Sequence, residues 1–179
     1  MVLLTHPSNF VLTKLEEHTS IKELLMQEIN KLGTHSLIEN FGNVNQQISN
    51  TDWHLGPTIK RNYINIFSPI VNIHCENVVN SLKLPFSIIA GSIWFQQYAP
   101  TDFHDWHVHA NCLYSNVYYL DLPEGSSKTS FKILDEEFEI DVEEGDILTF
   151  PGSVMHCSRP NKSKNTKTVI SFNTTLKSI

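Results

Sequence analysis

The 179-residue sequence has little of what marks several protein classes. Its 3 cysteines are an odd number and include no Cys-x-x-Cys pair, so the sequence predicts reduced thiols, not a disulfide framework. No apolar run approaches the roughly 20 residues that span a bilayer, and the N-terminal residues lack the basic-then-apolar order of a signal peptide. We therefore expect a soluble cytoplasmic protein with no membrane partner.

Charged residues are also scarce. They make up 18% of the chain, and the formal net charge is −6. A negative chain is not attracted to phosphate backbones, which argues against nucleic acid as a partner. The length and the 40% of apolar residues fit a single domain, 1–179, with an ordinary core.

The first part of the chain carries helical patterns. Apolar residues recur at helical spacing from Ile21 to Leu32, with Ser20 as the expected N-cap and Gly33 beyond the end. A second helix is expected to open at Ser68-Pro69, because proline favours the first helical turn, and to end before residue 85. Residues 34–60 are rich in polar residues and are expected to be irregular. We predict a helical support region over residues 1–85.

Residues 86–179 read as strands and turns. Strands are expected at residues 86–97, 115–122, 130–134, 138–142, 147–150 and 169–173. Helices followed by strands are the order of an α+β domain. The predicted fold is therefore a double-stranded β-helix, a jelly-roll or cupin-like barrel, with N-terminal supporting helices and a barrel core over residues 86–179.

Two histidines stand at the centre of the aromatic-rich segment that leads into the barrel. In an extended chain, alternate side chains share a face, so His107 and His109 would point into one space. An open catalytic metal site usually has three protein ligands, and His156 is the candidate for the third. We predict one metal held by these three histidines. His104 remains an alternative ligand or a supporting group, and the other histidines are expected to be ordinary surface or core residues.

Five segments carry a family resemblance through their order and spacing. They are ISNTDWHL (48–55), WFQQYAPTDFHDWHVH (94–109), YSNVYYLDLP (114–123), EEGDILTFPGSVMH (143–156) and KTVISFN (167–173). With them the chain resembles the 2-oxoglutarate and iron(II)-dependent oxygenases, particularly the small prolyl-hydroxylase-like members of bacteria and of phages of marine bacteria. The iron triad of that superfamily is His-x-Asp/Glu and a distal His. His107 and His156 match it, while His109 fills the carboxylate position, as in the phage-like members.

The resemblance implies Fe(II), 2-oxoglutarate as co-substrate and O₂. It also implies a hydroxylation coupled to decarboxylation of 2-oxoglutarate to succinate. Lys167 matches the basic residue that pairs with the far carboxylate of the co-substrate, and Tyr98 and Tyr119 match positions that hydrogen-bond it. Four aromatic residues are expected to wall the pocket: Trp94, Phe95, Phe103 and Trp106. By analogy, the substrate is a prolyl or other peptidyl residue.

Two other functions fit the same barrel. Gly145, Pro151 and His156 also match the second cupin motif, although the glutamate that follows His-x-His in cupins is missing. A three-histidine metal enzyme independent of 2-oxoglutarate would have no need of a cation at Lys167, which could then be an ordinary strand-edge lysine. A barrel that binds metal without catalysis is the third interpretation.

Overall fold

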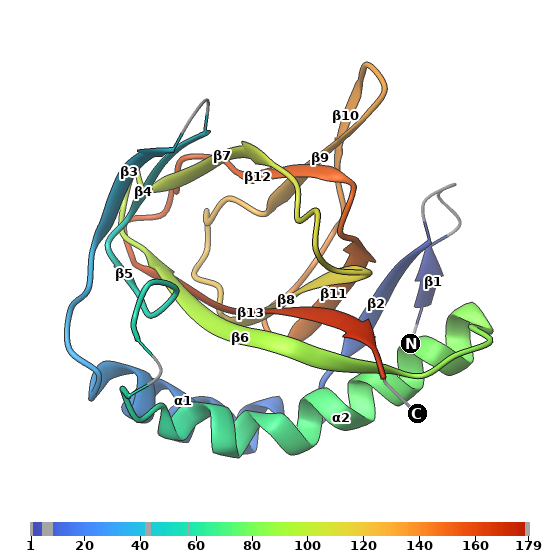
Figure 1. Cartoon of the computed structure of the whole chain (residues 1–179). Coiled ribbons are helices and arrows are strands. Elements are labelled where there is room, and N and C mark those ends of the chain that lie inside the picture. The colour runs from blue at the N-terminus through green and yellow to red at the C-terminus, as the bar shows by residue number, and fades with distance from the viewer. Residues whose placement is uncertain (1, 5–8, 42–43, 57, 178–179) are drawn as a thin grey trace.

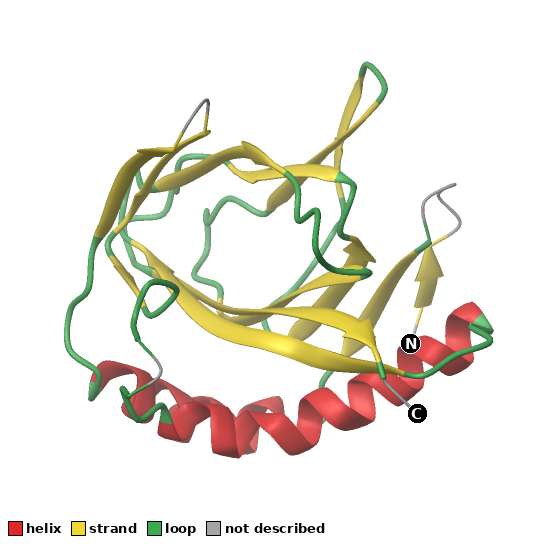
Figure 2. Cartoon of the chain, in the orientation of Figure 1, coloured by secondary structure: helices red, strands yellow, loops and turns green. Residues whose placement is uncertain are grey.

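The computed structural model describes residues 2–4, 9–41, 44–56 and 58–177. Two antiparallel sheets face each other around a barrel-like interior, and two helices lie along the outside of the larger sheet (Figure 1). Figure 2 shows that the helices stay on this one side while strands form the rest of the barrel wall. The architecture is a double-stranded β-helix of the α+β class, as the sequence predicts.

The larger sheet has the strand order β1-β2-β11-β8-β13-β6-β5, and the smaller has the order β10-β9-β12-β7-β4-β3. The larger sheet consists of β1 (Val2–Leu4), β2 (Phe10–Lys14), β11 (Asp146–Pro151), β8 (Tyr114–Asp121), β13 (Lys167–Leu176), β6 (Ile88–Tyr98) and β5 (Asn50–Thr51). The smaller consists of β10 (Glu136–Glu139), β9 (Thr129–Ile133), β12 (Met155–Ser158), β7 (Phe103–His107), β4 (Val44–Ile48) and β3 (Leu37–Phe41).

The central strand β13 shows why this sequence builds a two-sided wall. Alternate side chains of a strand point to opposite faces. Lys167, Val169 and Ser171 face the barrel interior, while Ile170 and Phe172 pack toward the helices. One strand therefore contributes both to the lining of the interior and to the apolar core under the helices.

The helices α1 (His18–Asn30) and α2 (Asn62–Leu82) cover the outer face of the larger sheet. Their buried residues meet the sheet in one apolar cluster that includes Leu25, Tyr63 and Phe67. A second cluster, with Phe10, Phe131 and Phe150, fills the space between the two sheets. The first cluster joins the helices to one wall of the barrel, and the second packs the barrel beside its cavity.

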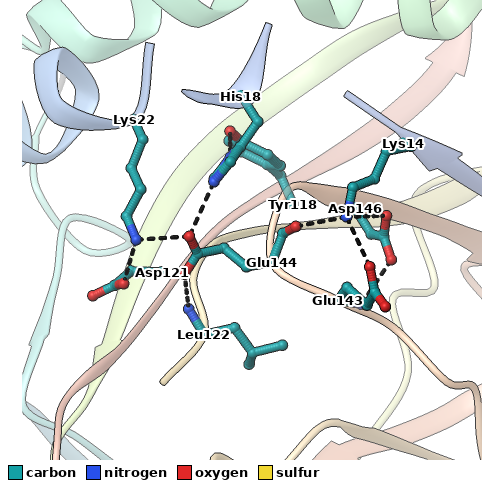
Figure 3. A network of polar contacts seen from close by, with 9 residues as sticks. All are labelled: Lys14, His18, Lys22, Tyr118, Asp121, Leu122, Glu143, Glu144 and Asp146. Atoms are coloured by element: carbon teal, nitrogen blue, oxygen red, sulfur yellow. Dashed lines mark hydrogen bonds and ion pairs between the residues drawn. The ribbon is translucent and has the colours of Figure 1, made fainter. Parts of the chain in front are cut away.

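A polar network fixes α1 to the end of the sheet (Figure 3). The ring of His18 lies 2.7 Å from the Tyr118 hydroxyl and 3.1 Å from the Glu144 carboxylate. Lys22 donates to both Asp121 and Glu144. Gly145 is needed beside them, because a Cβ there would lie 2.9 Å from the His18 ring and the backbone has φ +89°.

Both helices begin earlier than predicted. The first begins at His18, two residues before Ser20, whose hydroxyl donates to the Glu17 carbonyl instead of capping the helix. Gly33, beyond its end, does take a positive φ of 79°. The second begins at Asn62, so Pro69 lies inside it. The Asn65 carbonyl, which a proline cannot satisfy, belongs to a solvent-exposed residue.

The prediction of irregular structure over residues 34–60 is wrong for its described part. This stretch contains β3, β4 and β5, and β4 pairs with β7 at Gln46 and Gln47. The polar sequence of this stretch gives no clear strand pattern. β4 is a strand because it pairs with β7, a segment more than fifty residues away in the chain. Five of the six strands predicted in the second half are present and β7 and β12 occur in addition, whereas the strand expected at 138–142 is β10, which lies at Glu136–Glu139 and ends before residue 140. Among the described residues, no helix has the length and apolar character to cross a bilayer.

Candidate metal site

Two of the three predicted metal ligands are neighbours across paired strands. His107 is the last residue of β7, His156 lies on β12, and the two are register partners in the antiparallel ladder. His109 lies beyond the end of β7, so strand alternation does not place it, contrary to the sequence argument. A backbone hydrogen bond of 2.8 Å from its N–H to the Gly152 carbonyl holds it instead.

Gly152 allows this loop to approach. A Cβ at this position would lie 2.8 Å from the His109 carbonyl oxygen and 2.5 Å from the Cys112 sulfur, closer than real Cβ contacts. The N–H of Gly152 in turn donates to the Leu113 carbonyl at 3.0 Å. The glycine therefore joins the loop after β7 to the turn before β12, and this junction brings the third imidazole to the other two.

The three imidazoles converge. One ring nitrogen of each of His107, His109 and His156 lies within 4.8 Å of the others. The Nδ1 atoms of His107 and His156 lie 2.7 and 2.8 Å from the backbone carbonyls of Asp105 and Val154. Because a carbonyl oxygen only accepts, each of these Nδ1 atoms carries the proton, and each Nε2 keeps a free lone pair. This is the pattern of histidines that bind metals through Nε2.

Burial keeps these rings neutral. It is the main cause that lowers the pKa of His107, that brings the pKa of His109 to about 4, and that holds the pKa of His156 well below its usual range. The neighbouring imidazoles add to the depression for His109 and His156. Among the described residues that line this cavity there is no carboxylate. Three neutral nitrogen donors without a counter-charge suit Fe, Zn, Cu or Ni rather than Ca or Mg.

His104 stacks on the site instead of joining it. Its ring lies parallel to that of His107, with centroids 3.8 Å apart, and it lines the same cavity. Burial and the nearby imidazoles lower its pKa to about 2. In the described chain, the converging ring nitrogens belong to His107, His109 and His156, and His104 is not part of that group. Its place favours a supporting role behind His107.

Lys167 lies in the same cavity and is fully buried. Its ammonium donates to the Ser158 hydroxyl at 2.8 Å and to the Ser127 carbonyl at 2.9 Å, and it lies 4.4 Å from the centre of the Tyr98 ring. Burial lowers its pKa to about 7. Of the two predicted tyrosines, Tyr98 lines the cavity. Tyr119 lies one contact away, with its hydroxyl 2.8 Å from that of Thr129, which does line it.

Only one of the four aromatic residues expected in the wall is there. Trp94 lines the cavity and packs against His109. Phe95 points the other way, into the core under α2. Phe103 and Trp106 are not among the lining residues, and the guanidinium of Arg159 lies over Trp106. Strand alternation explains the difference between Trp94 and Phe95, because neighbours on β6 face opposite sides.

The sequence interpretation missed Asn173, which contacts the His109 ring with its amide nitrogen 3.2 Å from Nδ1. A signal was present in the last strand. Lys167, Val169, Ser171 and Asn173 alternate along it, and all four line the cavity. If Lys167 points inward, the same alternation places Asn173 inside as well.

A groove of about 490 Å³ opens beside His109. Ser92, Asn173 and Thr175 line it from β6 and β13, together with residues of the loop after β7. Trp53, with 52% of its surface exposed, stands on this groove and meets Trp94 edge to face at 4.5 Å. The described residues that line the groove include no Asp, Glu, Lys or Arg, and their one imidazole is that of His109.

Comparison with known proteins relates this fold to solved structures. The sequence matches no protein-family model and no curated protein. A prolyl-4-hydroxylase from Pseudomonas putida is 13% identical, with a TM-score of 0.64 and 93% of each chain covered. A 2OG-Fe(II) oxygenase family protein from Burkholderia pseudomallei is 8% identical, with a TM-score of 0.71, over 93% of this chain and 84% of that one.

A third structure is a prolyl hydroxylase from Trichoplax adhaerens in complex with a peptide fragment of the hypoxia inducible factor oxygen degradation domain. It is 12% identical, with a TM-score of 0.65, over 92% of this chain and 82% of that one. At such identities the likeness concerns the fold. The chain therefore shares the double-stranded β-helix fold of these oxygenases, and its three converging histidines lie inside that barrel.

Proposed function

We propose that the protein is a 2-oxoglutarate- and Fe(II)-dependent dioxygenase. It hydroxylates a substrate while 2-oxoglutarate is decarboxylated to succinate. The observation that carries the proposal is that one cavity holds both the converging histidines and the buried Lys167. Neutral imidazoles attract a metal cation, and a buried ammonium is stabilised by an anion. A metal-chelating dianion meets both requirements.

The spacing of the two parts supports this ligand. Ser158, which accepts from the Lys167 ammonium, lies two residues after His156 on β12, and both side chains line the cavity. Two residues of extended strand span about 7 Å. 2-Oxoglutarate has a chelating keto acid at one end and a second carboxylate two methylene groups further on, so it fits between the histidines and the lysine.

Each residue of the cavity has a separate task in this proposal. When bound, iron(II) with 2-oxoglutarate supplies the chemistry that activates O₂. His107 and His156 present Nε2 lone pairs because backbone carbonyls hold their Nδ1 protons. Lys167 orients the co-substrate as a single point charge, without the two-pronged contact that arginine would make. Trp94, Phe150 and Val169 line the cavity and exclude water.

We extend the proposal to a peptidyl substrate, a prolyl residue by analogy, bound in the groove beside His109. The groove is uncharged in its described lining and carries amide and hydroxyl groups, which suit a neutral backbone. Trp53 offers an exposed aromatic face for an apolar side chain. The peptide bound by the Trichoplax adhaerens enzyme is consistent with this choice. We place the protein in the cytoplasm, where its three free cysteines would stay reduced.

Anaerobic titration tests the function directly. Iron(II) and 2-oxoglutarate are added without O₂, and the visible charge-transfer band of a chelated keto acid is followed. We expect a band for the wild type, loss of the band for His107→Ala and His156→Ala, and weaker co-substrate binding for Lys167→Ala. Succinate formation in air then measures turnover. Iron binding without a band, unaffected by Lys167→Ala, would sink the proposal.

The main alternative is a cupin-like three-histidine metal enzyme that does not use 2-oxoglutarate. The neutral donor set favours it, since His109 stands where the oxygenase triad has a carboxylate. The buried ammonium of Lys167 has no task in such an enzyme. The same titration separates the two functions. Metal binding without consumption of 2-oxoglutarate or O₂ would instead indicate a non-catalytic module.

A further inference from the structure

A chain of polar side chains runs from the His109 ring back to its own backbone. The Asn173 amide nitrogen lies 3.2 Å from Nδ1 of His109, and the Ser115 hydroxyl donates to the Asn173 amide oxygen at 2.9 Å. The sulfur of Cys112 lies 3.6 Å from the Ser115 hydroxyl and 3.5 Å from the His109 carbonyl oxygen. Asn173 and Ser115 are register partners on β13 and β8, so the sheet itself holds them side by side.

This environment differs from that of the other two converging histidines. His107 and His156 face backbone carbonyls, which only accept, so the position of their ring proton is fixed. An asparagine amide has a donor end and an acceptor end. In the structure its nitrogen faces His109, so Nδ1 accepts and the ring proton sits on Nε2. In that tautomer His109 offers no lone pair to the shared centre.

Turning the amide by half a rotation gives a second complete arrangement. The Nδ1–H of His109 donates to the amide oxygen of Asn173, and the amide nitrogen donates to the Ser115 hydroxyl. That hydroxyl then donates to the Cys112 sulfur, whose S–H donates to the His109 carbonyl oxygen. No partner is lost, because hydroxyl and thiol groups both donate and accept. The Nε2 lone pair of His109 is now free.

We infer that Asn173 is a positioning residue that selects the tautomer of His109 and so decides whether this imidazole is a metal ligand. The inference rests on the metal site of the proposed function and adds to it a residue that acts through its contact with the His109 ring. It also bears on the replacement of a carboxylate by His109. A carboxylate ligand needs no tautomer control, whereas an imidazole does.

Two substitutions of Asn173 distinguish the donor function of its amide from the acceptor function. Asn173→Asp has nearly the same shape but only accepts, so it holds the proton on Nδ1. Asn173→Leu neither donates nor accepts. Asn111→Asp is the matched control, because it adds the same charge to a residue of the same groove that has no part in the chain of hydrogen bonds. The backbone amide NMR spectrum of each variant shows whether it is folded.

The first readout uses the protein without added metal. Two-bond ¹H–¹⁵N correlations of the imidazole nitrogens identify which one is protonated. We expect His109 to carry its proton on Nε2 in the wild type and on Nδ1 in Asn173→Asp, while His107 and His156 stay Nδ1-protonated in both. An unchanged His109 tautomer in Asn173→Asp would overturn the inference.

The second readout is the affinity for Co(II), followed by its visible spectrum. We expect Asn173→Leu to weaken binding by about 10- to 100-fold, as loss of a group behind a ligand does, and Asn173→Asp to restore or exceed wild-type affinity. An affinity for Asn173→Leu within about twofold of wild type would contradict the inference. Asn111→Asp should not reproduce the effect of Asn173→Asp.

These readouts do not depend on turnover. A protein with the expected tautomers and Co(II) affinities that forms no succinate would refute the proposed oxygenase function and support the role of Asn173. If the protein forms succinate but substitutions at Asn173 change neither the His109 tautomer nor the metal affinity, the oxygenase function is supported and the role of Asn173 is refuted.

Discussion

Histidine side chains are hydrogen-bonded differently in two regions of this molecule. At the junction of α1 and the larger sheet, both ring nitrogens of His18 have protein partners, the Tyr118 hydroxyl and the Glu144 carboxylate (Figure 3). In the barrel, His107 and His156 each use one nitrogen on a backbone carbonyl and keep the other free. Satisfied rings join elements of the fold, and half-satisfied rings that converge form a binding site.

The charges of the two regions differ in the same way. Around His18, lysines and carboxylates alternate, with Lys14 and Lys22 paired to acidic residues. In the cavity, the buried Lys167 and four imidazoles lie together, and no described lining residue is acidic. The first region is electrostatically complete within the chain. The second has no such acidic partner among its described lining residues, which is why we place the proposed binding of an anionic co-substrate there.

Removing a converging histidine should have the largest effect. We expect His156→Ala to weaken Co(II) affinity by more than about 100-fold, the upper end of what loss of a group behind a ligand costs. The identical change at His18 should leave metal affinity unaltered. Isothermal titration of both variants measures this. If His18→Ala impaired binding as much as His156→Ala, the distinction between the two regions would be wrong.

Removing the buried cation should come next. Lys167→Met should cost 2-oxoglutarate binding about 2 kcal/mol or more, as for one partner of a buried charge pair, which is about 30-fold in Kd. Equilibrium titration of the iron-loaded wild type and variant with 2-oxoglutarate gives the two Kd values to compare. Lys22→Met, in the surface network, should leave Kd as it is. A Kd for Lys167→Met within threefold of wild type would show that the ammonium does not bind the co-substrate.

The pH dependence of co-substrate binding should report the same residue. Burial lowers the Lys167 pKa from its usual value near 10.5 to about 7. Above that pH the free protein has lost the proton that a bound carboxylate requires, so binding takes up a proton. Affinity should therefore fall as pH rises above about 7, by up to about tenfold per unit. Titrations in buffers of different ionisation enthalpy detect this uptake, and Lys167→Met should lack it.

Truncating the groove tryptophan should have a smaller effect. Trp53→Ala should raise KM for the primary substrate by about five- to tenfold, in keeping with the loss of roughly 1 kcal/mol of aromatic contact. The Kd of 2-oxoglutarate should stay the same, because Trp53 does not line that cavity. Initial rates at varied substrate concentration separate the two constants. A change confined to co-substrate binding would move the substrate away from this groove.

The smallest expected effect is on stability, and it comes from the polar network around His18, Lys22 and Glu144. Its ion pairs and backbone contact bring the pKa of Glu144 to about 2, against the opposing effect of burial. A depressed folded-state pKa gives stability that is present above about pH 4.5 and lost as pH falls toward 2. Glu144→Gln should lower the unfolding free energy by less than about 1 kcal/mol at pH 7 and flatten its decline in acid. Urea denaturation at several pH values measures this.

Glu143→Gln is the matched control for that experiment. Its carboxylate pairs with Lys14 at 3.2 Å but is 81% exposed, so its removal should change the urea profile less than Glu144→Gln at every pH. An equal effect of both substitutions would show that α1 does not depend on the contacts to His18 and Lys22.

Much of this architecture could be predicted from local sequence. The strand predicted at residues 169–173 is confirmed as part of β13, in which Lys167 and Val169 line the cavity while Ile170 packs toward the helices. The change from helical to strand periodicity near residue 86 gives the fold class. By contrast, β4 has a polar sequence and is a strand because it pairs with β7, and α2 passes through Pro69 because its buried residues on either side pack on the sheet. Local sequence propensity carries no information about such distant partners.

The sequence by itself determined which residues are available: the three histidines of the predicted metal site, a lysine at the start of the last strand and three cysteines without a Cys-x-x-Cys pair. The tertiary structure alone decided how they are used. It placed His109 through the close approach at Gly152, turned Phe95 away from the cavity and set Asn173 against the His109 ring. The reason is physical: periodicity along a chain fixes which face a side chain takes, whereas distances between imidazoles and their acceptors arise only when remote strands come into register.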